Sequence, residues 1–291
     1  MSSESRQDSG QSSKWLGRLW YVGFAGFLGA TLLGSTLPDR EASLPLAVPA
    51  PAQPGVPAAD DSYPPSAPRT VTMDDAVRLI EAARERFRDV RDYSCRLVQR
   101  ERVGDKLPPE TVAELEVRSR PFSVHMKWLE PRSMVGQEAI YATGKNDGKM
   151  RVRGAGLLGA IGFISLDVND PRARSTSRHS ITEAGLGNLI ERFAEGWPNE
   201  RRHGAVDLRI DEFTFAGRAC TRVETVHPVN PDGFFLFGRS VVYFDKNTEL
   251  PIRVENYDWP KNPGEAGPLL EEYSYLELRL NPGLGDDVYD H

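Results

Sequence analysis

The sequence predicts an α+β domain built on one curved antiparallel sheet, preceded by an N-terminal transmembrane helix. Three observations predict this: an uncharged segment near the N-terminus, a change from helical to alternating apolar periodicity near residue 90, and closely spaced strand-like runs after it. Strands that follow one another so closely need hairpin connections, which make the sheet antiparallel. A sheet of roughly nine to eleven strands tends to curl. We therefore expect a curved sheet with a few helices covering its concave face.

The segment 19–37, LWYVGFAGFLGATLLGSTL, carries no charge and follows Lys14 and Arg18. As a helix rising about 1.5 Å per residue it would span roughly 28 Å, the thickness of a bilayer's hydrocarbon core. The poor match to a cleavage site favours an uncleaved anchor, with a cleaved signal peptide as the alternative. The basic residues before the span place residues 1–18 in the cytoplasm and the C-terminal domain in the periplasm. The expected location is the inner (cytoplasmic) membrane, crossed once.

Residues 38–69 are rich in proline and alanine. Proline fixes φ and lacks an N–H donor, so this stretch can form neither a helix nor a central strand. We expect a disordered, extended linker between the membrane and the domain that follows. Residues 70–291 are enough for one domain with a sizeable core.

The first element of that domain is an amphipathic helix over 72–90. Thr72 and Asp75 have the spacing of a capping box, and apolar residues recur on one helical face. The apolar period then becomes two. Strands are expected over 93–103, 111–118, 122–128, 137–143, 149–153, 206–215, 218–226, 234–245, 251–257 and 269–280, with a second helix over 185–197.

Two groups of apolar residues are candidates for a ligand site. Val124, Met126 and Trp128 alternate with polar residues along one strand and would line a cavity or form ordinary core. The uncharged segment 154–166, GAGLLGAIGFISL, holds four glycines, which a buried strand does not normally use. It could be a lid over the cavity, a loop that dips into a membrane, or a core segment. The candidate gate residues in it are Leu157, Leu158, Ile161 and Phe163.

Signatures of catalysis are missing from the sequence. It contains no G-x-S-x-G, H-E-x-x-H, P-loop or S-x-x-K motif, and its five histidines share no metal-ligand spacing. Adjacent acidic residues such as Glu271 and Glu272 would point to opposite faces of a strand, so they would not form a catalytic pair. The net charge of −6, with basic and acidic residues mixed, argues against binding to nucleic acid. We predict a protein that is not an enzyme and holds no cofactor or metal.

The two cysteines, Cys95 and Cys220, lie 125 residues apart in strand-like runs. Their spacing excludes C-x-x-C metal or redox chemistry. In an oxidising compartment they could form a disulfide, or they could be two separate buried thiols.

Five blocks of the sequence carry a family resemblance. They are YSCRLVQRERVGDKL (93–107), RPFSVHMKWLEP (120–131), EAIYATGKNDGKMRVRGAGLLG (138–159), SRHSITEAGLGNLIERF (177–193) and YSYLELRLNPGLGDDVYD (273–290). Together they resemble the LolA-like lipoprotein-carrier superfamily and, within it, a bacterial family of exported proteins with no assigned function. The resemblance implies an unclosed β-barrel whose concave apolar face binds acyl chains. It extends over most of residues 90–290.

The resemblance implies binding of lipid or lipoprotein acyl chains in an apolar half-barrel cavity, without chemistry. Typical carriers of this type diffuse freely, whereas the span 19–37 makes this chain a membrane-anchored extracytoplasmic protein in our prediction. Burial of the chains would stabilise the complex by about 0.8 kcal/mol per CH₂ group. The alternative is an envelope interaction or sensor protein of the RseB type, which regulates sigma-factor signalling by binding another envelope protein. A structural module with a filled core is a third possibility, because one fold serves many functions.

Overall fold

A computed structural model describes residues 71–290 of the chain, except residues 205, 230–232 and 263. The predicted membrane helix over 19–37 and the linker over 38–69 lie outside the described residues. Within the described residues, no helix combines the length and the apolar character needed to cross a bilayer.

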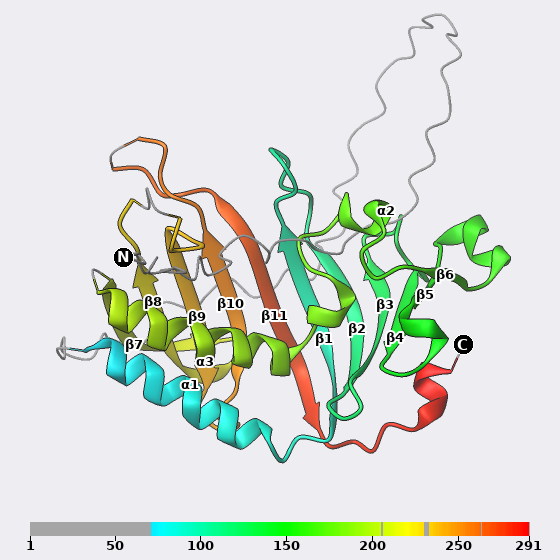
Figure 1. The fold of residues 1–291 in the computed structure, drawn as a ribbon, viewed down its shortest axis with the longest axis horizontal. Coiled ribbons are helices and arrows are strands. Elements are labelled where there is room, and N and C mark those ends of the chain that lie inside the picture. The colour runs from blue at the N-terminus through cyan, green and yellow to red at the C-terminus, as the bar shows by residue number, and fades with distance from the viewer. Residues whose placement is uncertain (1–70, 205, 230–232, 263, 291) are drawn as a thin grey trace, which may run out of the picture.

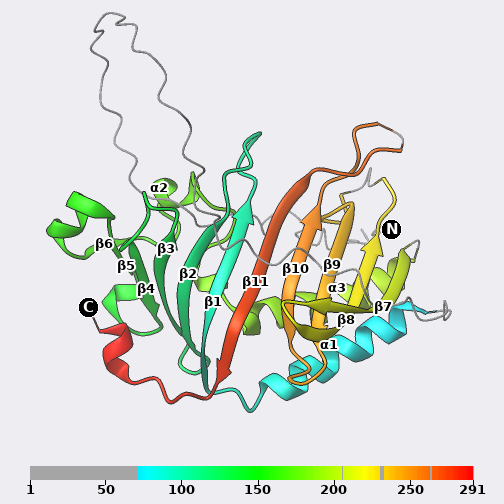
Figure 2. The same cartoon turned by 180° about the vertical axis from the view of Figure 1, so that it is seen from behind.

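All eleven strands of the described chain belong to one antiparallel sheet (Figures 1 and 2). Their order in space is β6-β5-β4-β3-β2-β1-β11-β10-β9-β8-β7, and every neighbouring pair is antiparallel. The bounds are β1 Asp92–Glu101, β2 Thr111–Arg118, β3 Ser123–Glu130, β4 Glu138–Ala142, β5 Met150–Arg153, β6 Ile164–Leu166, β7 Asp207–Phe215, β8 Arg218–Val226, β9 Arg239–Asp245, β10 Pro251–Tyr257 and β11 Leu269–Leu280. The predicted antiparallel sheet is confirmed.

The sheet consists of two meanders that meet at its centre. Strands β1 to β6 run in chain order from the centre to one edge, and β7 to β11 run from the other edge back to the centre. The β1–β11 pair is therefore the only ladder that joins the two halves in the described chain. The edge strands β6 and β7 are not paired with each other in the described residues, so the sheet is unclosed, as predicted.

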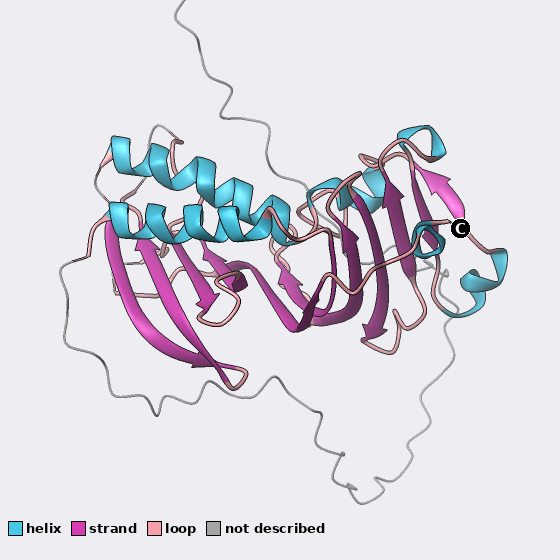
Figure 3. Cartoon of the chain, turned by 90° about the horizontal axis from the view of Figure 1, so that it is seen from below, coloured by secondary structure: helices cyan, strands magenta, loops and turns pink. Residues whose placement is uncertain are grey.

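Two long helices lie side by side across the concave face of the sheet (Figure 3). They are α1 (Met73–Phe87) and α3 (Leu186–His203). The predicted capping box of α1 is present, because the backbone N–H of Thr72 donates to the Asp75 carboxylate over 2.9 Å. Helix α3 is longer than predicted. Its apolar pattern ends at Trp197, but the helix continues through polar residues, which a surface helix can carry without burying them.

Shorter elements connect the strands. They are η1 (Asn146–Gly148), η2 (Gly156–Ile161), α2 (Pro171–Arg174), η3 (Ile181–Glu183) and η4 (Asp286–Tyr289). Strand β6 was not predicted, since its three residues are too few to show alternation. Strand β9 is shorter than the expected 234–245. Phe234 and Phe235 precede it and pack instead against the rings of His203 and His227.

The main core lies between the helices and the concave face of the sheet. Side chains from α1, α3 and the inward positions of the strands fill it. Cys95 lies in this core, whereas Cys220 lies in a separate cluster with Phe215 and Tyr243 on the other face. Both cysteines are buried and free. The two are therefore separate thiols in this structure.

Candidate functional site

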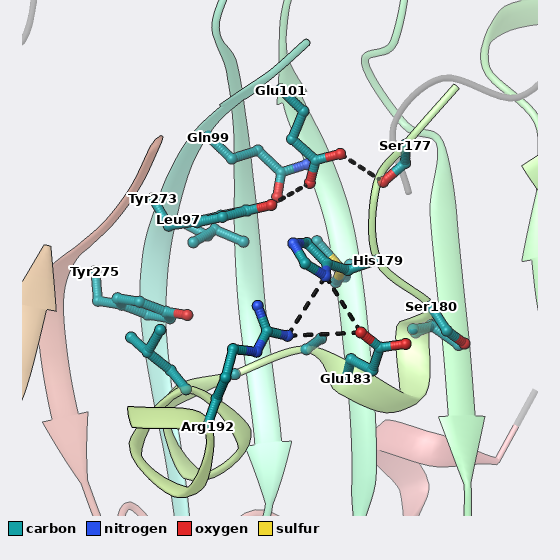
Figure 4. Close-up of a pocket in the computed structure, with 15 residues that line it drawn as sticks. Leu97, Gln99, Glu101, Ser177, His179, Ser180, Glu183, Arg192, Tyr273 and Tyr275 are labelled. Atoms are coloured by element: carbon teal, nitrogen blue, oxygen red, sulfur yellow. Dashed lines mark hydrogen bonds and ion pairs between the residues drawn. The ribbon is translucent and has the colours of Figure 1, made fainter. Parts of the chain in front are cut away.

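A small cavity lies between α3, η3 and the concave face of the sheet; we call it the inner cavity (Figure 4). Its volume is about 60 Å³. Strands β1, β3 and β11 form its floor, and the segment 177–185, which we call the latch segment, forms much of its cover. The apolar part of its wall consists of Leu97, Met126, Ile181, Leu189 and Tyr275.

Two carboxylates on the floor of this region face each other across the central strand pair. The inward positions of β1 include Leu97, Gln99 and Glu101, and those of β11 include Glu271, Tyr273 and Tyr275. In the β1–β11 register, Glu101 lies directly opposite Glu271. The exposed fractions of these residues are only 5% and 0%. Like charges placed opposite each other destabilise a sheet, and buried charges are costly unless they are paired and hydrogen-bonded.

The latch segment supplies most of the compensating groups. Glu101 accepts hydrogen bonds from the Ser177 hydroxyl over 2.9 Å and from the backbone N–H of Arg178 over 2.6 Å. Tyr273 adds a third, from its hydroxyl over 2.6 Å. Glu271 accepts from Arg178 Nε over 2.8 Å and, on its other oxygen, from Asn256 Nδ2 over 2.8 Å. The carboxylates therefore fix the latch segment to the sheet.

His179 forms the centre of the cluster, as Figure 4 shows. Its Nε2 lies 2.9 Å from Glu271, which is not drawn in Figure 4, and its Nδ1 lies 3.2 Å from Glu183. Burial alone would lower the pKa of His179, but the charge of Glu271 and hydrogen bonds to both carboxylates raise it to about 9. Burial would likewise raise the pKa of Glu271, yet the His179 charge outweighs burial and lowers the pKa. His179 is therefore an imidazolium at neutral pH and donates to both carboxylates.

A larger cavity of about 370 Å³ adjoins the first; we call it the outer cavity. The two cavities share His179, Glu183 and Arg192, which mark the boundary between them. The remaining lining of the outer cavity comes from one face of α3, which adds four polar or charged side chains, and from two apolar residues of the loop before β9. These residues are Asn188, Glu191, Glu195, Gly196, Asn199, Leu236 and Phe237.

The structure places the first group of predicted site residues in the core of the concave face. Val124 and Trp128 are fully buried there, and Met126 is buried and lines the inner cavity. The alternation along β3 thus gave the correct inward face. Their binding of a ligand stays a prediction.

The predicted gate residues lie elsewhere. Leu157 and Ile161 on η2 are 94% and 71% exposed, so the interpretation of this segment as core is wrong for them. Leu158 is half-buried, and Phe163 packs with Tyr289 against the other face of the sheet. None of the four lines either cavity. Their gating role stays a prediction.

The polar cluster is the part of the site that sequence reasoning missed. The sequence contains a pattern that could have indicated this cluster. Along β1, the inward positions that include Leu97 continue with the polar residues Gln99 and Glu101. Glu271 does the same at the start of β11, while its neighbour Glu272 pairs with Arg253 on the opposite face. The expected separation of the adjacent carboxylates 271 and 272 is confirmed.

No group of three or more histidine, cysteine, aspartate or glutamate residues that could hold a metal ion occurs in the described part of the chain. The chemistry of the cluster is that of ion pairs and hydrogen bonds. Among the described residues, Glu101 and Glu271 each have three hydrogen-bond partners, and neither cysteine is part of the lining of the two cavities. The arrangement is suited to holding a segment or a ligand in place.

These features define a class: an unclosed, curved antiparallel sheet with helices across its concave face and an amphipathic cavity between the two layers. A family model described as "Protein of unknown function (DUF1571)" matches residues 90–291, and the chain belongs to this family. The matched range contains the whole sheet. A comparison with curated proteins finds no match.

Solved structures give further likenesses. The chain is similar to the Mycobacterium tuberculosis lipoprotein LppX, with 11% identity and a TM-score of 0.43 over 75% of this chain and 100% of that chain. It is similar to the LolA superfamily protein NE2245 from Nitrosomonas europaea, with 13% identity and a TM-score of 0.29 over 76% and 99%. In the Pseudomonas aeruginosa MucA/MucB complex it matches 61% of one chain, with 17% identity and a TM-score of 0.42 over 75% of this chain. The predicted membership of a family with no assigned function agrees with the family model.

Proposed function

We propose that this protein binds the acyl chain of a lipid or lipoprotein between α3 and the concave face of its sheet, without chemistry. The observation that supports this is the inner cavity, where apolar side chains of three strands and α3 meet beneath a polar latch segment. Apolar chains gain about 0.8 kcal/mol for each buried CH₂ group. Val124, Met126 and Trp128 would form the floor beneath the chain.

The inner cavity is too small for an acyl chain in this structure. Its volume of about 60 Å³ is under half of the about 150 Å³ that holds a benzene molecule in an engineered protein cavity. An acyl chain therefore needs part of the cover to move. The latch segment is the part suited to this, because Glu101 and Glu271 hold it by polar contacts that water can replace.

The N-terminal part of the chain supports a location for this binding. The span 19–37 would anchor the protein in the inner membrane, and the proline-rich linker 38–69 would let the domain reach lipids outside the cytoplasm. Leu157, Leu158, Ile161 and Phe163 would act as a gate or membrane contact at the far edge of the sheet. The partners would be acyl chains and the membrane.

Uptake of a fluorescent fatty acid by the purified protein tests the proposal. We expect saturable binding, which Leu189→Trp weakens at least about fivefold by filling the inner cavity and Leu189→Ala preserves by enlarging it. Val135→Trp, at a 49% exposed residue outside both cavities, is the matched control and should bind like the parent protein. Absence of uptake by the parent protein, or undiminished uptake by folded Leu189→Trp, would reject acyl-chain binding and favour an RseB-type interaction role.

A further inference from the structure

The ligand's head group can be inferred from the charges along the two adjoining cavities. Part of the inner cavity's wall is apolar, and α3 adds the polar or charged side chains of Asn188, Glu195 and Asn199 to the outer cavity. A tail in the inner cavity would therefore place its head group at the boundary and in the outer cavity. The charged groups met in that order decide what head group fits.

The first charge on this path is the guanidinium of Arg192, at the boundary between the cavities (Figure 4). Its Nη2 lies 3.5 Å from Glu183 and 3.4 Å from His179 Nδ1. Its Nε and Nη1 make no hydrogen bond to any described residue. Arg178 of the latch segment and Arg253 on the opposite face of the sheet instead have short contacts of 2.6 to 2.8 Å to carboxylates and a hydroxyl. Arg192 thus keeps donors available for an anionic group.

The second charge is the carboxylate of Glu195, which lines the outer cavity only. It is exposed and lies near enough to Arg84 to add to the rise in the pKa of that residue that Glu191 mainly causes, but it makes no salt bridge with any residue in the described ranges. Glu191, the other carboxylate on that stretch of α3, is already paired with Arg84 over 2.7 Å. Arg192 and Glu195 are three residues apart on one helix, about 4.5 Å along its axis. They share a face of the helix.

The path therefore presents an apolar wall, then a cation with available donors, then an unpaired anion. A phospholipid with a zwitterionic head group carries the complementary order of tail, phosphate and ammonium. Resting on the proposed function, we propose that the ligand is a single-chain zwitterionic phospholipid, with its phosphate at Arg192 and its ammonium group at Glu195. One chain requires less opening of the inner cavity than two chains would.

Displacement of the fluorescent fatty acid from the full chain, held in an amphipathic polymer, tests this assignment. The competitors are lauroyl lysophosphatidylethanolamine and lauroyl lysophosphatidylglycerol, which share a tail and a phosphate but differ in the ammonium group. We expect the ethanolamine lipid to displace the probe at an about fivefold lower concentration, the size of a favourable exposed ion pair. Arg192→Gln should weaken both lipids about tenfold, because both lose the phosphate contact.

Glu195→Gln should abolish the preference for the ethanolamine lipid while leaving the glycerol lipid nearly unchanged. Glu114→Gln removes the same charge from an exposed residue on the convex side of β2 and should keep the preference. Equal displacement by the two lipids, or a preference that survives Glu195→Gln, would overturn the head-group assignment alone. Failure of the parent chain to bind the probe would instead overturn the proposed function.

Discussion

The imidazolium of His179 is the residue on which the buried cluster depends. It bridges Glu271 and Glu183 and lies beside Arg192 at the boundary of the two cavities. A neutral ring could donate to only one of these carboxylates. The buried, cross-strand pair of Glu101 and Glu271 would then lack part of the positive charge that balances it. Protonation of one ring therefore affects the stability of the whole latch.

This gives a prediction for stability against pH. The folded pKa of His179 is about 9, above the ordinary value of about 6.5. Its stabilising contribution is fully present below pH 6.5 and is lost as the pH rises to about 9. We expect the free energy of unfolding to fall by roughly 2 to 3 kcal/mol over this range in urea titrations.

The variant His179→Gln should be less stable at pH 6 and should show a shallower decline between pH 6.5 and 9. His125, on the convex face between Glu116 and Glu138, also has a raised pKa and accounts for part of any remaining slope. His125→Gln is therefore the matched control. A slope that is identical in His179→Gln and the parent protein would contradict this role of His179.

At the scale of elements, the start of α3 contacts the sheet closely at Gly185 and at the backbone N–H of Leu186. Gly185 precedes the helix with φ 92° and ψ 170°, a conformation that is essentially open to glycine alone. The next N–H, of Leu186, donates to the Tyr93 hydroxyl of β1 over 2.7 Å. A Cβ at position 185 would lie 2.3 Å from that hydroxyl oxygen. The latch segment and α3 therefore meet the sheet at a position without room for a side chain.

We predict that Gly185→Ala lowers the free energy of unfolding by at least about 2 kcal/mol, from backbone strain and loss of the Tyr93 contact. Chemical denaturation followed by circular dichroism measures this. Gly217→Ala is the control: Gly217 has φ 74° in the β7–β8 turn but nothing within 4 Å of an added Cβ. It should cost about 1 kcal/mol. Equal losses in the two variants would show that the contact with Tyr93 contributes nothing.

The sequence predicts well those helices and strands whose buried face follows from local periodicity. Val124, Met126 and Trp128 face the core because alternation along a strand is a local property. The contacts of Glu101 with Ser177 and Arg178 join positions 76 and 77 residues apart. They depend on where the chain returns after β6, which periodicity does not encode. The fold could therefore be predicted largely from sequence, and the polar half of the site could not.

The segment 154–166 is a second case in which sequence alone does not predict the environment of a residue. Its composition is that of core, yet Leu157 projects into solvent with 94% exposure. The segment follows β5 at the edge of the sheet, where few neighbouring elements remain to cover it. Burial of an apolar residue depends on what lies opposite it, and sequence alone does not supply that information.

At the scale of the whole molecule, a retained anchor would restrict the domain to lipids near its own membrane. We predict that the protein from isolated membranes has the mass of a chain that includes residues 19–37, and that it resists extraction by alkaline carbonate. Deletion of residues 1–37 behind a cleavable signal should release the domain into the soluble fraction. Recovery of the protein in the soluble fraction, with an N-terminus that begins after residue 37, would contradict a retained anchor.

The pairing of β1 with β11 at the centre of the sheet also determines the order in which the molecule can fold. Each meander forms from neighbouring hairpins, but Tyr93 of β1 must find Leu280 of β11 across nearly the whole domain. Pairings so distant in sequence form slowly, because the chain loses much entropy before the contacts form. Until then β1 and β11 are both open edges that can pair with other chains. We therefore expect the pairing of β1 with β11 to be the slow step of folding, and its delay to add two temporary open edges to the permanent edges at β6 and β7.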